Sequence, residues 1–433
     1  MLEHATSTAS PYSRAARSIG ESVTHGTRMR IAQLNAGLAE EDRIIDLSIG
    51  TLDLPTDRTI DQGVIDFIRT RPDLIHQFAP VKGFDFLLES IAGRTLRLHG
   101  VRYDPDREIM VTPGGIKGAI AVVLHTLLDP GDEVVVPLPN WPHYADMIRL
   151  HGGVPRFVQP DGPVQQAITP AELAGALNER TKLVILGDCI NPTGNVPTSD
   201  ELHGLAAVVL RHNRARASDG LAPVFILYDC PYEAHILEQR PQAIASMTVD
   251  GRPVRAHVIG VTGPGKTYGM HGDRIGYICA PAPFIDAAAN VQVNLNSFAG
   301  TYGQVACFHA TQASMDAVAS ERARAARANM LCMVDLLGAL DLAVDTPQGG
   351  YFLFVDLAAH APRYRAAGFE RAAPFLLERA RVATLAGDHF AEGYADAARY
   401  RDFVRINCGR DRAVLVQAAQ RIGYALASLA APA

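Results

Sequence analysis

The chain has 433 residues, of which 48% are hydrophobic and 20% charged, and its formal net charge is −6. This length exceeds what one hydrophobic core usually serves, so we expect two or three domains. Scattered charge of slightly acidic balance excludes a basic face for nucleic acid. Apolar stretches stop well short of the roughly 20 residues that cross a bilayer, so the sequence predicts no membrane span.

The six cysteines lie far apart without a C-x-x-C pattern, which is typical of reduced thiols in a cytoplasmic protein. The fifteen histidines form no cluster at metal-ligand spacing, so we predict no metal site. The first 30 residues lack the apolar core of a secretory signal, and we expect a mobile arm there.

Helical patterns alternate with short apolar runs from about residue 85 to 330. Helices are predicted at 87–98 and 117–128, with a strand at 109–112 between them. Further strands are predicted at 133–137, 183–186, 225–228, 257–261 and 276–280. Near-continuous apolar strands that alternate with helices predict an α/β fold, in which helices flank both faces of a mainly parallel mixed sheet.

Beyond about residue 320 the pattern changes to a long Ala- and Arg-rich helix, strands near 351–356 and 403–407, and a closing helix from residue 412. These elements predict a smaller α+β domain, completed by the segment 44–49. The polar stretch 211–223 is predicted to be an exposed loop. We expect three parts: an N-terminal arm with part of the small domain (1–60), a large domain (61–325) and a C-terminal small domain (326–433).

One short stretch, G-V-T-G-P-G-K-T at 260–267, fits the phosphate-binding loop of nucleotide-binding proteins. That loop requires a long helix directly after it, but glycines at 269, 272 and 276 follow Thr267 and precede an apolar run. The acidic residue at a strand end, Asp229, also lies upstream rather than downstream. We therefore interpret Lys266 differently: a lysine after a strand can form a Schiff base with an aldehyde such as pyridoxal phosphate.

Such a cofactor requires a carboxylate at its pyridine nitrogen and donors for its phenolate oxygen. Asp229, in Y-D-C-P-Y, ends an apolar strand and is the candidate carboxylate, with a turn or helix-capping aspartate as the alternative. Tyr232 and Asn191 are candidate donors to the phenolate oxygen. Tyr232 is equally well explained by packing, and Asn191 by the turn N-P-T-G, in which the Asn191–Pro192 bond is a candidate for the cis isomer.

The cofactor also requires an aromatic ring to stack on and donors for its phosphate. Trp141, in P-N-W-P-H-Y, is the candidate ring, with a buried core tryptophan as the alternative. Gly115 and Ile116, in T-P-G-G-I-K, precede an apolar helix whose first amides can bind phosphate. Arg274 is a candidate for a bidentate contact with the same phosphate, or for a surface ion pair.

Taken in order, these motifs resemble the fold-type I pyridoxal-phosphate enzymes, specifically the class I/II aminotransferase family, over residues 44–422 or so. The resemblance implies an aspartate-aminotransferase-like fold. It implies that Lys266 forms an aldimine with the cofactor and later moves the α-proton of the substrate. It also implies that Arg405, in F-V-R-I-N, binds the α-carboxylate of the substrate. Gly50, Asn191 and Trp141 are implied as further substrate contacts.

By the same resemblance the protein transfers an amino group between an amino acid and a 2-oxo acid. The family implies a homodimer with shared active sites, to which residues within 294–304 contribute across the interface. An alternative is elimination or replacement, cyclisation or oxidation of an amino acid or S-adenosylmethionine on the same scaffold. A non-catalytic binding protein is a further alternative, disfavoured because both Lys266 and Arg405 are present.

Two positions depart from the family pattern. Phe78 stands where the family commonly has a tyrosine that reaches the phosphate of the partner subunit, and Gly263 stands where it usually has a serine. Two hydroxyl donors to the phosphate are therefore missing. His143 and His271 are additional titratable residues near the expected site.

Overall fold

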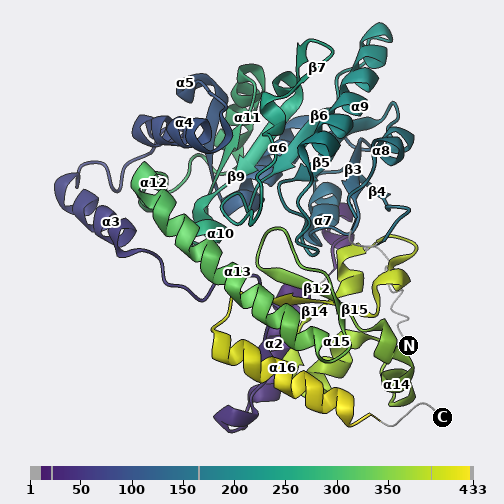
Figure 1. The fold of residues 1–433 in the computed structure, drawn as a ribbon. Coiled ribbons are helices and arrows are strands. Elements are labelled where there is room, and N and C mark those ends of the chain that lie inside the picture. Colours follow the sequence, from purple (N-terminus) through teal and green to yellow (C-terminus); the bar gives the residue numbers. More distant parts are fainter. Residues whose placement is uncertain (1–10, 21–22, 164–165, 392, 430–433) are drawn as a thin grey trace, which may run out of the picture.

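A computed structural model of the chain describes residues 11–20, 23–163, 166–391 and 393–429 (Figure 1). The first ten residues of the predicted N-terminal arm lie outside this part. A seven-stranded sheet has the order β2-β10-β9-β6-β5-β3-β4, and β10 alone runs antiparallel to its neighbours. Its strands are β2 (Ile109–Pro113), β3 (Glu133–Pro137), β4 (Val154–Val158), β5 (Thr181–Gly187), β6 (Phe225–Asp229), β9 (Val258–Thr262) and β10 (Ile275–Cys279).

Helices cover both faces of this sheet, because its strands are apolar on both sides (Figure 1). One buried cluster joins the sheet to α8 and α9, and another joins it to α6, α7 and α11. The helices of this part are α3 (Arg58–Thr70), α4 (Asp85–His99), α5 (Pro105–Glu108), α6 (Gly115–Leu127), α7 (His143–Leu150), α8 (Pro170–Ala176), α9 (Ser199–Ser218), α10 (Pro264–Tyr268), α11 (Ala282–Leu295) and α12 (Thr301–Ala310). The predicted mainly parallel mixed sheet is confirmed.

A smaller antiparallel sheet has the order β11-β12-β15-β14. The segment that contains β1 pairs with β13, as expected for 44–49. The strands outside the large sheet are β1 (Ile45–Asp46), β7 (Thr248–Val249), β8 (Arg252–Pro253), β11 (Ala343–Val344), β12 (Phe352–Asp356), β13 (Val382–Ala383), β14 (Leu385–Ala386) and β15 (Phe403–Asn407). The helices around it or at the N-terminus are α1 (Arg14–Arg17), α2 (Val23–Asn35), α13 (Asp316–Gly338), α14 (Ala361–Ala366), α15 (Ala372–Phe375) and α16 (Arg412–Ala427).

The long helix α13 links the two sheets (Figure 1). Near its start, the Arg322 guanidinium donates to the Thr267 carbonyl oxygen of α10 at 2.9 Å. Further along, Met330, Met333 and Leu337 belong to the core of the small sheet. The helix therefore runs without a break through residue 325, and the boundaries proposed at residues 60 and 325 stay a prediction.

The prediction of an exposed loop at 211–223 is wrong for its first part, because α9 continues to Ser218. Asn213 is buried, and its amide group exchanges two hydrogen bonds with the backbone of Val224, at 2.9 and 2.8 Å. Arg216 is also buried and donates to the Ala222 carbonyl oxygen at 2.6 Å. These polar side chains form hydrogen bonds with backbone groups of the segment that leads into β6. Composition alone does not indicate such bonds.

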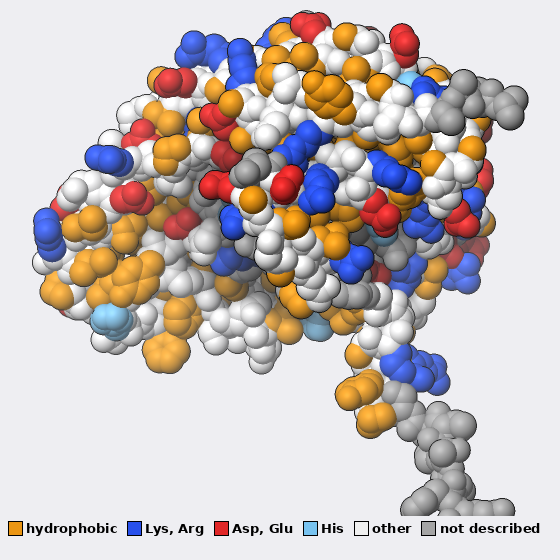
Figure 2. All heavy atoms as spheres, turned by 90° about the horizontal axis from the view of Figure 1, so that it is seen from below, with side chains coloured by type: hydrophobic (Ala, Val, Ile, Leu, Met, Phe, Trp, Pro, Cys, Tyr) orange, Lys and Arg blue, Asp and Glu red, His pale blue; other side chains and the backbone are white. Residues whose placement is uncertain are grey.

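The surface carries an apolar region beside α3. In the view from below, hydrophobic side chains gather at the left, the side on which α3 lies (Figure 2). Ile65 and Ile68 of α3 are exposed, as is Tyr302, and Phe78 is 87% exposed. None of the described helices is long and apolar enough to cross a membrane.

Candidate active site

One cavity of about 520 Å³ lies at the carboxyl ends of the parallel strands. Every residue that the sequence selected for the site lines it: Gly50, Gly115, Ile116, Trp141, Asn191, Asp229, Tyr232, Lys266, Arg274 and Arg405. His143 and His271 line it as well. Parallel strands end at one edge of the sheet, so residues that follow different strands meet there.

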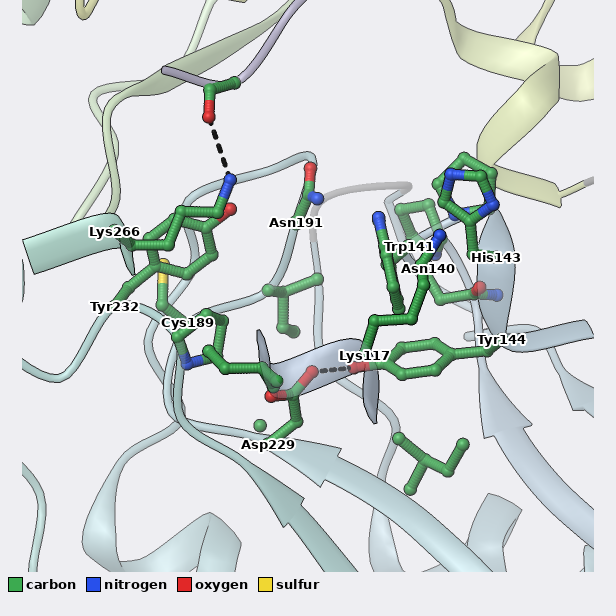
Figure 3. A pocket seen from close by; sticks show the side chains of 18 of the residues that line it. Lys117, Asn140, Trp141, His143, Tyr144, Cys189, Asn191, Asp229, Tyr232 and Lys266 are labelled. Atoms are coloured by element: carbon green, nitrogen blue, oxygen red, sulfur yellow. Dashed lines mark hydrogen bonds between the residues drawn. The ribbon is translucent and has the colours of Figure 1, made fainter. Parts of the chain in front are cut away.

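Lys266 lies on the five-residue helix α10, directly after β9. Its Nζ donates to the Gly50 carbonyl oxygen at 2.8 Å (Figure 3). Burial, and after it the charge of Arg405, lower the pKa of Lys266 to about 8, and the charge of Asp229 opposes this shift. The helix ends at Gly269 with φ 78°, so it is too short to bind a nucleotide's phosphates in the manner of a phosphate loop.

Asp229 ends β6 and is buried. Its Oδ2 accepts a short hydrogen bond from the Tyr144 hydroxyl (Figure 3), whereas its Oδ1 is buried without a hydrogen-bond partner among the described residues. Burial raises the pKa of Asp229 to about 6, against the lowering effects of Tyr144 and Lys266. An unpaired buried carboxylate oxygen is costly unless a donor arrives.

Trp141 lies on the opposite side of the cavity from Lys266 (Figure 3). Its ring makes edge contacts with His143 and Tyr144, with centroids 4.9 and 5.2 Å away. The Lys117 ammonium lies 5.1 Å from the centroid of the Trp141 ring. Burial lowers the pKa of Lys117, and the charge of Arg274 lowers it further.

Arg405 comes from β15 of the small sheet and is only 4% exposed. Its Nη1 donates to Asn191 Oδ1 at 3.0 Å and its Nη2 to the Ser48 carbonyl oxygen at 2.6 Å. Its Nε is buried without a partner among the described residues. The guanidinium lies 4.2 Å from the ring centroid of Phe352, and burial lowers its pKa to about 10.

Tyr232 is buried close by, where its ring meets the edges of two other rings. The centroids of Tyr351 and Phe352 lie 5.6 and 5.8 Å away. Tyr351 also donates to the Gly50 carbonyl oxygen that accepts from Lys266, at 3.2 Å. Tyr232 is therefore packed between aromatic rings, as the alternative predicted, and also lines the cavity.

The start of α6 faces the same cavity. Gly114 and Gly115 have φ values of 85° and 72°, a conformation that favours glycine. The amide of Gly115, predicted to bind phosphate, already donates to the Arg274 carbonyl oxygen at 2.9 Å. The amides of Ile116 and Lys117, in the first turn of α6, remain for an anion.

Tyr144 and Lys117 are among the polar cavity residues that were not predicted from the sequence. Tyr144 lies three residues after Trp141 within the quoted P-N-W-P-H-Y motif, and Lys117 lies within T-P-G-G-I-K. Both were visible in the motifs, but neither has a side-chain role that a motif alone reveals. The cis peptide bond of the described residues is Leu138–Pro139, so the interpretation of Asn191–Pro192 as the cis bond is wrong.

No group of three or more His, Cys, Asp or Glu side chains that could hold a metal ion occurs within the part of the chain that the structure describes. All six cysteines are unpaired.

Residues 42–422 match the family model described as aminotransferase class I and II. A curated aspartate aminotransferase from Bacillus sp. (strain YM-2) is 29% identical over 349 residues, covering 80% of this chain and 84% of that protein. A probable aspartate/prephenate aminotransferase from Thermus aquaticus is 32% identical over 319 residues, covering 73% of this chain and 76% of that protein.

Solved structures agree with these relatives. The aspartate aminotransferase from Thermus thermophilus with maleate has a TM-score of 0.82 and 27% identity, covering 96% of this chain and all of that one. The aspartate aminotransferase from Rhizobium meliloti has a TM-score of 0.83 and 26% identity, covering 98% of this chain and all of that one. The predicted fold type is confirmed, and amino-group transfer is favoured over elimination, cyclisation or oxidation.

Proposed function

The chain belongs to the aminotransferase class I and II family, and we propose on that premise that it transfers amino groups with pyridoxal 5'-phosphate as its cofactor. The amino donor is an amino acid and the acceptor a 2-oxo acid. The observation that carries the proposal is the meeting of an amine with a lowered pKa, Lys266, and an unpaired buried carboxylate oxygen, that of Asp229, in one cavity.

The residues present fit this cofactor. The unpaired Oδ1 of Asp229 suits a protonated pyridine nitrogen, and the first turn of α6 with Arg274 suits a phosphate. When bound, pyridoxal phosphate supplies an aldehyde for a primary amine and a ring that accepts electrons from the α-carbon of the substrate. Lys266 would hold it covalently, and Trp141 would stack on its ring.

Lys266 is suited to take and return a proton. Its pKa of about 8 keeps an appreciable fraction of the amine unprotonated near neutral pH, which an exposed lysine does not achieve. The Gly50 carbonyl oxygen, 2.8 Å away, orients the amine. Asp229 is ionised above about pH 6. Near neutral pH it can therefore keep the pyridine nitrogen of the cofactor protonated.

Arg405 binds the α-carboxylate of the substrate in this proposal. The guanidinium lies over the Phe352 ring, and Asn191 and Ser48 hold two of its nitrogens. The buried Nε has no partner, so it is left to donate to an incoming carboxylate.

Lys117 favours an acidic substrate. Its amine faces the cavity over Trp141 and makes no ion pair with a carboxylate of the described residues. Similar proteins are named aspartate or aspartate/prephenate aminotransferases, and one solved structure contains maleate. We therefore propose that Lys117 binds the second carboxylate of a dicarboxylic amino acid or oxo acid.

The apolar region beside α3 supports a homodimer. An 87% exposed Phe78 is unusual for a free surface, and it packs against Phe298 with ring centroids 5.4 Å apart. The segment 294–304 borders this region and is proposed to complete the site of the partner subunit. Six unpaired cysteines support a cytoplasmic location.

The test is a half-reaction followed by visible absorbance. Aspartate added without an oxo acid should shift the cofactor band of the purified protein, and a 2-oxo acid added afterwards should restore it. Arg405→Leu should abolish the shift at the same aspartate concentration. If no amino acid of a broad panel produces the shift in the wild-type protein, the proposed reaction is wrong.

A further inference from the structure

The phosphate end of the cavity has fewer free donors than its residues suggest. Arg274 uses two guanidinium nitrogens on backbone oxygens: Nη2 donates to Gly114 at 2.5 Å and Nη1 to His271 at 3.3 Å. The Gly115 amide is also occupied. A phosphate has three terminal oxygens, each of which accepts more than one hydrogen bond. The phosphate can therefore accept more hydrogen bonds than the first amides of α6 and the remaining donors of Arg274 supply.

The backbone excludes a side-chain donor at position 263. A Cβ built on Gly263 would lie 2.7 Å from the Ile275 carbonyl oxygen and 3.2 Å from Gly276 Cα. The antiparallel strand β10 therefore packs directly on this residue. Phe78 carries no hydroxyl group either. Neither position supplies a side-chain donor, so any further donor to the phosphate has to come from another residue.

His271 lies beside this gap. Its side chain lines the cavity with Gly265 and Arg274, and its Nδ1 is 3.6 Å from the position that a Cβ of Gly265 would take. The imidazole ring therefore lies in contact distance of the residue that precedes Lys266. Nε2 of His271 is buried and makes no hydrogen bond to the described residues.

The surroundings of His271 favour an anion. Burial, and after it the charges of Lys266, Arg274 and Arg322, lower the pKa of His271 to about 4. The imidazole is therefore neutral in the cofactor-free site, and in the tautomer that carries its proton on Nε2 the N–H group has no acceptor among the described residues. A buried donor among cations is satisfied most readily by an anionic oxygen.

We propose that the Nε2–H group of His271 donates a hydrogen bond to the phosphate of the cofactor, in place of the hydroxyl groups missing at positions 78 and 263. This inference rests on the proposed function, because it concerns the phosphate of pyridoxal phosphate. It gives a cofactor-binding role to His271, for which the sequence predicted only a position near the site.

The test compares two aldehydes that differ only in the phosphate. Dissociation constants of pyridoxal phosphate and pyridoxal are measured from the absorbance of the lysine adduct for the wild-type protein, His271→Leu and His271→Gln. We expect His271→Leu to weaken pyridoxal phosphate by roughly tenfold or more and pyridoxal by less than about twofold. His271→Gln, which keeps an N–H donor, should recover most of the loss.

His143→Leu is the matched control, because it removes another imidazole from the same cavity. It should change both dissociation constants by the same factor, since the His143 ring lies against Trp141. The proposal is overturned if His271→Leu weakens the two aldehydes equally or leaves both unchanged. A wild-type protein that forms no adduct with pyridoxal phosphate would instead refute the proposed function.

Discussion

The reactivity of Lys266 should respond in opposite directions to the loss of its two charged neighbours. Its pKa is about 8 because it is buried near Arg405, and Asp229 partly opposes the shift. At about pH 8 half of the amine is then unprotonated, against roughly 0.3% for an ordinary lysine. Arg405→Leu removes a repulsion and should raise the pKa, whereas Asp229→Asn removes an attraction and should lower it further.

The assay uses the cofactor-free protein. The rate at which an amine-reactive reagent modifies Lys266 is followed by mass spectrometry across the neutral and alkaline range, and the midpoint gives the pKa in each variant. Circular dichroism checks that both variants are folded. Equal midpoints in all three proteins, or a lower midpoint in Arg405→Leu, would refute the electrostatic reasoning, because burial alone would then set the reactivity.

Three further outcomes follow from single contacts. Tyr144→Phe removes the donor that lowers the pKa of Asp229, so the acidic limb of the kcat/KM profile should move to higher pH; an unmoved limb would contradict this. Arg94→Leu should lower the free energy of unfolding by about 3 kcal/mol in denaturant titrations, because it strips the buried Glu233 of a 2.9 Å ion pair. The pKa of Glu233 is lowered in the native protein, so this deficit should be full above the ordinary carboxyl pKa and shrink as the pH falls; a pH-independent deficit would speak against the ion pair. Gly263→Ser should weaken cofactor binding and lower the Tm, because its Cβ would meet a β10 carbonyl oxygen at 2.7 Å; tighter binding would show that the backbone yields.

Most strands of the large sheet could be predicted because they are apolar runs bounded by turn residues. The strand β4 (Val154–Val158) was not predicted, because Pro155 and Arg156 interrupt its apolar pattern. The predicted strand at 133–137 coincides with β3, and the other large-sheet predictions differ from the structure by a few residues at their ends. The end of α9 could not be predicted from composition, since Asn213 and Arg216 are buried through bonds to backbone groups distant in the sequence. Polar residues indicate exposure only when no such partner exists.

Asp229 and Lys266 could be predicted because they end or follow strands whose ends meet at one edge of the sheet, whereas Arg405, within β15 of the small sheet, was predicted only through the family resemblance. The hydrogen bonds among them could not, because they depend on side-chain placement. Gly115 shows this: its position at the cavity was predicted, but its amide is engaged by Arg274. The constraint on Gly263 likewise depends on how closely β10 approaches, and no motif records that distance.

The central claim is that Lys266 is the residue joined to the cofactor. Purified protein is incubated with pyridoxal phosphate, reduced with borohydride, digested and analysed by mass spectrometry. We expect one reduced adduct, on the peptide that contains Lys266, and its loss in Lys266→Ala. An adduct on another lysine, or no adduct at all in the wild-type protein, would contradict the account.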